Sequence, residues 1–136
     1  SIKKIYPSTI NIDIKPTTFI ARLSSNDQLV GANGKLIIDN ENDEILPYIF
    51  GEFNSQDFLS FKSNIEKSKF NFTQFKILYF FPSNRWDILT NEDILIKLPQ
   101  ANFSQTLNLA YKIIISDDFK NKSVIDLRMK NHLITK

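Results

Sequence analysis

Short runs of alternating apolar and polar residues recur along the chain, which is the pattern of half-buried β-strands. In the first run, Ile10, Ile12 and Ile14 alternate with polar residues between Pro7 and Pro16. Because proline cannot donate a hydrogen bond to a strand ladder, this strand should lie between the two prolines.

Further strands are predicted from the same alternation and from turn residues. Asn33-Gly34 stands between two apolar runs, which is a strong hairpin signal, and the polar residues 90–93 separate two more apolar runs. The apolar residues 46–51 contain a proline and a glycine, so we expect an irregular plug there. The predicted strands are residues 10–14, 17–23, 29–30, 36–38, 75–81, 85–89, 94–98, 124–127 and 133–135.

Two segments place apolar residues at helical spacing. The first begins at Asn54 or Ser55 and ends near residue 68, and the second follows a capping box formed by Asn102 and Gln105. The apolar faces of these helices are predicted to carry Phe58, Phe61 and Ile65 in the first, and Phe103, Leu107, Ala110, Tyr111 and Ile114 in the second.

The order of elements predicts the fold class. Strands follow one another in hairpins and only two helices interrupt them, which favours an α+β domain. We expect a mostly antiparallel β-sheet with two amphipathic helices packed on one face. A break in composition between Pro16 and Ser24 indicates that the leading strand belongs to a different unit.

The composition excludes most familiar catalytic machinery. The chain has 136 residues, 42% of them hydrophobic, which fits one ordinary domain with a sizeable core. It has no cysteine, one histidine and three glycines. A disulfide framework, a thiol nucleophile, a cysteine–zinc cluster and a glycine-rich phosphate loop are therefore excluded, and no cofactor or metal is expected.

Charge and targeting signals select no compartment by themselves. The 17 basic and 15 acidic residues are scattered along the chain, whereas a nucleic-acid surface usually concentrates its cations on one face. No signal peptide opens the chain, so we expect a cytosolic protein or a domain whose targeting segment lies upstream. No stretch approaches the roughly 18 consecutive apolar residues of a membrane helix.

One acidic segment has the spacing of a calcium loop. Asp39, Glu41 and Asp43 alternate as the first ligands of such a loop do. Glu44 and Phe50 stand where the loop requires glycine and glutamate, so we expect a solvated acidic loop instead.

Two further classes of function depend on polar and aromatic residues of the predicted sheet. In Arg85-Trp86-Asp87, alternation puts Trp86 on one face and the charged pair on the other, which predicts a core tryptophan flanked by a surface ion pair. A hydrolase using Asp87 and Asp126 would need both acids in one cleft. A single-stranded nucleic-acid binder would use lysines and phenylalanines on the sheet, although the twelve phenylalanines are also needed to fill the core.

The last predicted strand, residues 133–135, is expected at an edge of the sheet. An edge strand offers unpaired N–H and C=O groups to the strand of a partner. The alternative from pattern alone is an edge that Lys130 and Lys136 protect against pairing.

Several segments, in their order and spacing, resemble one protein family. They are Lys4-Ile5-Tyr6-Pro7-Ser8-Thr9-Ile10 running into Ile12 and Ile14, Ile20-Ala21-Arg22, Asn33-Gly34, Leu46-Pro47-Tyr48-Ile49-Phe50-Gly51, Arg85-Trp86-Asp87-Ile88, Ile96-Lys97-Leu98-Pro99 and Val124-Ile125-Asp126-Leu127-Arg128. The family is FtsQ/DivIB, the bitopic cell-division proteins of bacteria, in a form like that of Gram-negative species.

The resemblance implies a domain assignment and a role. Residues 1–17 would be the last strand of a POTRA domain, and residues 18–136 would be the family's β domain. The protein would be a non-enzymatic scaffold of the divisome, in the periplasm and tethered to the inner membrane through an upstream segment. Its partners would be FtsB-like and FtsL-like proteins and other division proteins, and it would help to control the septal peptidoglycan synthase FtsW–FtsI.

The resemblance also implies a binding site, because in the family a segment of FtsB adds as a strand to the C-terminal edge. Met129 stands where some relatives have an aromatic anchor, and Arg85 resembles a basic residue, with an offset register, that meets an acidic residue of the partner. Replacing Ile134 with proline should remove a backbone donor at this edge. The expected partner-binding residues are Arg85, Arg128, Met129, Asn131, His132, Leu133, Ile134, Thr135 and Lys136.

Overall fold

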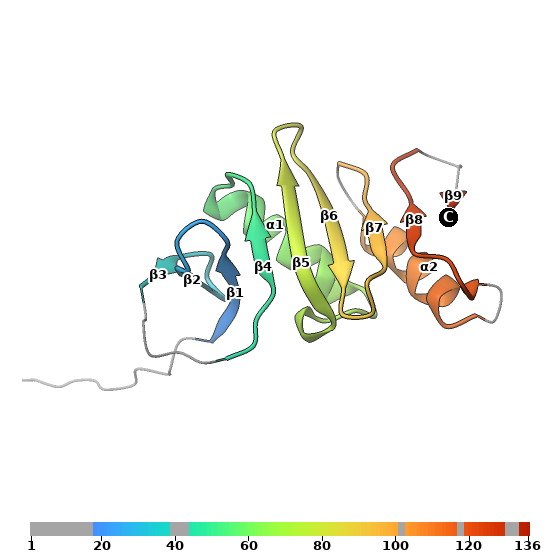
Figure 1. Cartoon of the computed structure of the whole chain (residues 1–136). Helices are drawn as coiled ribbons and strands as arrows, with labels where there is room; N and C mark the ends of the chain where they lie inside the picture. Colours follow the sequence, from blue (N-terminus) through green and yellow to red (C-terminus); the bar gives the residue numbers. More distant parts are fainter. Residues whose placement is uncertain (1–17, 39–43, 101–102, 117–118, 130–133) are drawn as a thin grey trace, which may run out of the picture.

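The computed structural model describes residues 18–38, 44–100, 103–116, 119–129 and 134–136. The described residues form one nine-stranded sheet in the order β3-β2-β1-β4-β5-β6-β7-β8-β9, with two helices (Figure 1). The predicted strand at residues 10–14 and most of the acidic loop lie outside them. The elements are β1 (Phe19–Leu23), β2 (Leu29–Gly31), β3 (Leu36–Ile37), β4 (Tyr48–Phe50), α1 (Ser55–Lys67), the 3-10 turn η1 (Phe72–Gln74), β5 (Phe75–Phe81), β6 (Arg85–Thr90), β7 (Leu95–Lys97), α2 (Ser104–Ile114), β8 (Val124–Asp126) and β9 (Ile134–Thr135).

The sheet is mixed, with an antiparallel majority. Five neighbouring pairs are antiparallel, and three pairs, β1–β4, β4–β5 and β7–β8, are parallel. The predicted α+β class and both predicted hairpins, β2–β3 and β6–β7, are confirmed. Two of the parallel pairs arise because α1 connects β4 to β5 and α2 connects β7 to β8, and the third, β1–β4, is connected through the hairpin β2–β3.

The expectation of an irregular plug at residues 46–51 is wrong, because Tyr48–Phe50 is strand β4. This strand lies between β1 and β5. It therefore joins strands β1 to β3 to strands β5 to β9 in one sheet. Pro47 precedes the strand, where its missing N–H costs no ladder bond, and its carbonyl accepts a hydrogen bond from the amide of Arg22 at 2.9 Å.

Gly51 makes the turn that leads from β4 to α1. Its φ is +109°, and a Cβ atom there would lie 2.1 Å from the carbonyl oxygen of Phe80. Only glycine fits this close approach. Beyond the turn, Phe53 packs against Phe58 and Trp86, with ring centroids 6.0 and 5.9 Å apart.

The first helix is as predicted. Asn54 is the N-cap, its side chain accepts a hydrogen bond from the amide of Asp57, and the carboxylate of Asp57 accepts one from the amide of Asn54. This capping box fixes the start of α1. The residues that α1 buries against the sheet are Phe58, Phe61 and Ile65.

The second helix starts differently from the expected capping box. Its N-cap is Phe103, which is buried and makes no capping hydrogen bond with its side chain. The side chain of Asn64, on α1, accepts hydrogen bonds from the amides of Phe103 and Ser104, each at 3.1 Å. One helix therefore caps the other, which holds both helices on the same face of the sheet (Figure 1).

Aromatic side chains fill the space between the helices and the sheet. Trp86 is buried, as predicted, and stacks on Phe61 with ring centroids 4.3 Å apart. Seven of the twelve phenylalanines are buried, so the core uses most of them. They are Phe58, Phe61, Phe70, Phe75, Phe80, Phe103 and Phe119.

Gly51→Ala is expected to destabilise the domain by at least about 3 kcal/mol, because the new methyl group clashes with the backbone of β5. Gly34→Ala is the matched control, since Gly34 also has a positive φ, of +81°, but the nearest atoms to its Cβ position are 3.4 Å away. The control should lose about 1 kcal/mol, through conformation alone. Urea unfolding measures both changes, and equal losses would contradict the steric account.

Candidate functional site

Among the residues that the structure describes, the last strand, β9, lies at one end of the sheet and is paired on one side only (Figure 1). It runs antiparallel to β8, with Thr135 opposite Ile125 and Ile134 opposite Asp126. Lys136 continues the ladder, because its amide donates to the carbonyl of Val124 at 3.0 Å and its carbonyl accepts from the amide of Val124 at 2.9 Å. The prediction of a C-terminal edge strand is confirmed.

The direction of the backbone groups follows from this register. In an antiparallel ladder, residues alternate between those that exchange hydrogen bonds with the neighbouring strand and those whose N–H and C=O point away from it. Lys136 exchanges such bonds with β8, and Ile134 does so two residues earlier. The N–H and C=O of Thr135 therefore point to the outer side of the sheet.

The structure describes only some of the other predicted site residues. Met129 is 61% exposed, Arg128 beside it is also exposed, and Lys122 donates to the hydroxyl of Thr135 at 3.0 Å. These exposed groups lie at the same end of the sheet as β9. Asn131, His132 and Leu133 lie outside the described residues, as does the side chain of Ile134.

A row of charged side chains crosses three neighbouring strands on the face opposite the helices. The register places Asp87 opposite Lys97, and Lys97 beside Asp126. With Arg85 and Arg128 these residues form what we call the ionic row, which has three cations and two carboxylates. Lys97 was not among the site residues predicted from the sequence, although its place in an alternating strand indicates which face of the sheet it occupies.

Arg85 and Asp87 form an ion pair in which the guanidinium donates to the carboxylate at 2.5 Å. The prediction of a surface pair is wrong, since the two side chains are only 17% and 7% exposed. The guanidinium also lies over the ring of Phe81, 4.6 Å from its centre. Burial raises the pKa of Asp87, and the positive charges of Arg85, Lys97 and Arg128 oppose that rise.

Asp126 and Arg128 form the second pair of the ionic row. The guanidinium donates twice to the carboxylate, from Nε at 2.9 Å and from Nη2 at 2.6 Å, and the amide of Arg128 donates to it at 3.1 Å. Mainly through the hydrogen bonds from the Arg128 side chain, the pKa of Asp126 falls to about 2. The pair holds the chain in a fixed turn at the end of β8.

The geometry does not provide the acid pair that a hydrolase would need. Strand β7 separates Asp87 from Asp126, and each carboxylate is bound by its own arginine. Within the described ranges there is no group of three histidine or acidic residues that could hold a metal ion. The arrangement is that of a structural ion-pair network beside an open strand.

A domain of this fold is found among bacterial cell-division proteins. The structure matches the major extracytoplasmic domain of the trans isomer of DivIB from Geobacillus stearothermophilus, with a TM-score of 0.54 and 12% identity over 78% of this chain and 98% of that one. The family model of the C-terminal region of cell division protein FtsQ/DivIB matches residues 20–128. The chain belongs to the FtsQ/DivIB family, as the resemblance in its sequence implied, and so to a family of cell-division scaffolds.

Two further findings concern curated sequences and membrane-spanning helices. No curated protein sequence matches the chain. Among the residues that the structure describes, no helix is long and apolar enough to cross a membrane.

Arg85→Ala is expected to destabilise the domain by about 2 to 3 kcal/mol, because it leaves the buried Asp87 without its nearest countercharge. The loss should shrink as the pH falls, since protonation of Asp87 removes the buried charge. Lys76→Ala is the control, because it removes the exposed Lys76–Asp93 pair, whose contribution is about 0 to 1 kcal/mol. Urea unfolding at several pH values tests this, and a loss no larger than that of the control would contradict it.

Asp126→Asn should change the acid stability of the domain in one direction. Because the pKa of Asp126 is lowered from its ordinary 3.8 to about 2, the carboxylate stabilises the fold above pH 3.8 and this contribution is lost as the pH falls towards 2. The stability difference between wild type and Asp126→Asn should therefore be largest at neutral pH and vanish near pH 2. A difference that stays constant over this range in urea unfolding would contradict the assignment.

Proposed function

We propose that this chain is the partner-binding β domain of a non-enzymatic divisome scaffold, and that it binds an FtsB-like or FtsL-like protein by strand addition along β9. In this proposal residues 18–136 form the β domain and residues 1–17 are the last strand of a POTRA domain. The domain stands in the periplasm, and an upstream segment tethers it to the inner membrane. Binding there helps to regulate septal peptidoglycan synthesis.

The observation that carries the proposal is the outward direction of the backbone of Thr135 at the open side of β9. A partner strand laid along this side gains one donor and one acceptor from Thr135. Each hydrogen bond of this kind contributes about 0.5 to 1.5 kcal/mol net. Backbone pairing along the described strand therefore sets the register, and side chains must supply most of the affinity.

Side chains of suitable chemistry lie beside this edge. Met129 is exposed and offers a flexible apolar contact. The ionic row carries one cation more than its carboxylates, and the guanidinium of Arg128 at its outer end is 43% exposed. The partner segment that fits is a β-strand with an apolar residue and at least one acidic residue, which electrostatic attraction would orient.

Arg85 has a narrower role in this proposal than the family resemblance implied. Its guanidinium is already held by Asp87 and by the ring of Phe81. Direct contact with a partner would require that this pair rearrange. Arg85 therefore acts mainly by keeping Asp87 neutralised and the row positive.

Thr135→Pro tests the proposal, because it removes the outward N–H and no hydrogen bond to β8. The probe is a peptide from the membrane-proximal periplasmic part of the FtsB-like protein of the same organism, titrated by calorimetry. We expect the affinity to fall at least about tenfold, because the partner loses a backbone bond and the ring crowds the edge. Thr135→Val, which keeps the N–H and removes the hydroxyl, is the matched control and should bind as wild type.

The variant Ile134→Pro, which the sequence suggested, is a less specific test of strand addition, because the amide of Ile134 faces β8. That variant should loosen the end of the sheet itself, as a lower thermal midpoint would report. Wild-type affinity in a folded Thr135→Pro variant would contradict strand addition at β9. Binding that is lost steeply with added salt and shared by single-stranded DNA would favour nucleic-acid binding instead.

A further inference from the structure

The opposite edge of the sheet, β3, is also a strand that the described part of the chain pairs on one side only. The amide of Gly31 donates to the carbonyl of Lys35 at 2.9 Å, and Val30 pairs with Leu36. By the alternation of antiparallel ladders, the carbonyl of Lys35 and the backbone groups of Ile37 turn to β2, and Leu36 turns its N–H and C=O outward. The amide of Lys35 donates instead to the side-chain oxygen of Asn33 at 3.0 Å. The side chain of Leu36 is 48% exposed.

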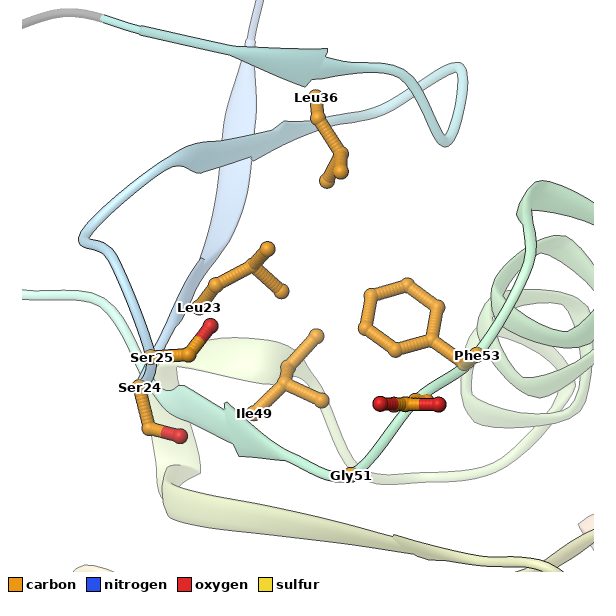
Figure 2. A pocket seen from close by; sticks show the side chains of 8 residues that line it. Leu23, Ser24, Ser25, Leu36, Ile49, Gly51 and Phe53 are labelled. Carbon is orange, nitrogen blue, oxygen red and sulfur yellow. The ribbon is translucent and has the colours of Figure 1, made fainter.

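A pocket of about 340 Å³ opens directly beside this edge. Figure 2 shows Leu36 from β3 facing Leu23, Ile49 and Phe53 across the open space, with Ser24 and Ser25 at one side. Four apolar side chains therefore form the walls, and the hydroxyl groups of the two serines lie at one side. The residues that line the pocket are Leu23, Ser24, Ser25, Leu36, Ile49, Gly51, Glu52 and Phe53.

The walls of the pocket are held in place by contacts that do not depend on a ligand. The hydroxyl of Ser55, at the start of α1, donates to the carbonyl of Gly34 in the β2–β3 turn at 3.1 Å. The amide of Ser24 donates to the carbonyl of Ile49 at 3.0 Å, which fastens the end of β1 to β4. The pocket is thus formed before anything binds, so binding there costs little ordering of the protein.

The charge at the pocket selects among apolar occupants. Of the described residues that line it, Glu52 is the one that carries a charge, and its side chain is exposed. A carboxylate at the rim of an apolar pocket favours a ligand that joins an apolar group to a cation. Lysine or arginine next to a large apolar residue in a polypeptide has this chemistry.

We propose that β3 and this pocket form a second peptide-binding site, which takes an extended segment of a partner protein. The segment adds along β3 through the outward N–H and C=O of Leu36. It places a large apolar side chain between Leu36 and Phe53, and its neighbouring lysine or arginine reaches Glu52. This site goes beyond the function proposed above, since it lies at the other end of the sheet from β9.

A random library of linear peptides displayed on phage tests the proposal without a known partner. Selection on the wild-type domain should enrich sequences with a large apolar residue and a lysine or arginine within two positions of it. A synthetic peptide of the enriched sequence should lose at least about tenfold in affinity on Leu36→Arg, which fills the pocket and repels the cation. It should also weaken several-fold on Glu52→Gln.

Leu109→Arg is the matched control, because Leu109 lies on α2 away from the pocket and is 45% exposed, much as Leu36 is. The peptide should bind this variant and Thr135→Pro as it binds wild type, so a failure at β9 and a failure at β3 are distinguishable. Methyl resonances of Leu23 and Ile49 should shift on binding in the folded wild-type domain.

Three results would overturn the proposal. The first is a selection that enriches no sequence with this pattern, and the second is an enriched peptide that binds Leu36→Arg as tightly as wild type. The third is a domain that dimerises through β3, which sedimentation would show as a dimer in wild type and a monomer in Leu36→Arg. In that last case a second copy would occupy the edge.

Discussion

The two helices of this domain each connect parallel neighbours of the sheet, and they lie on the same face of it. The rest of the structure follows from this constraint. The helix face buries the aromatic core around Trp86 and Phe61, and Asn64 on α1 caps α2, so the helices also fix each other. No described element covers the other face, and the described sheet does not close, so β3 and β9 remain edges.

The ionic row is a consequence of that one-sided packing. A buried carboxylate is costly unless it is paired, and Asp87 is buried on a face with no helix above it. Three positive charges compensate the charge of Asp87. They belong to Arg85 on the same strand, Lys97 on β7 and Arg128 just after β8. The same cations leave the row slightly positive next to β9, so a feature that stabilises the sheet also gives its edge a preferred sign of charge.

Local signals in the sequence predict the elements better than they predict the pairings. Asn54 caps α1 through a hydrogen bond three residues away, and Asn33-Gly34 forms a turn between adjacent strands. Both features can be predicted because they depend only on residues close together in the sequence. Strand β4 was missed because it is short and is stabilised by β1 and β5, which are far away in the chain. The cap of α2 was missed for the same reason, since Asn64 lies 39 residues before the amide of Phe103.

The candidate site divides in a similar way. The edge position of β9 is predictable, because a short apolar strand next to lysines is typical of the edge of a sheet. The burial of Asp87 and the inclusion of Lys97 depend on strand register, which the alternation of a single strand does not reveal. The pocket beside β3 depends on how the turn at Gly51 places Phe53, and composition carries no trace of it.

Amide hydrogen exchange at the last three residues tests the central claim most directly, because it reports the direction of each N–H without a mutation. In the free domain, the amide of Lys136 is bonded to Val124 and should exchange slowly, whereas the amide of Thr135 should exchange quickly. On addition of the FtsB-like peptide, exchange at Thr135 should slow at least about tenfold, since its N–H then joins a ladder. A Thr135 amide that is already protected in the free domain, or that stays unprotected when the peptide is bound, would contradict strand addition at this edge.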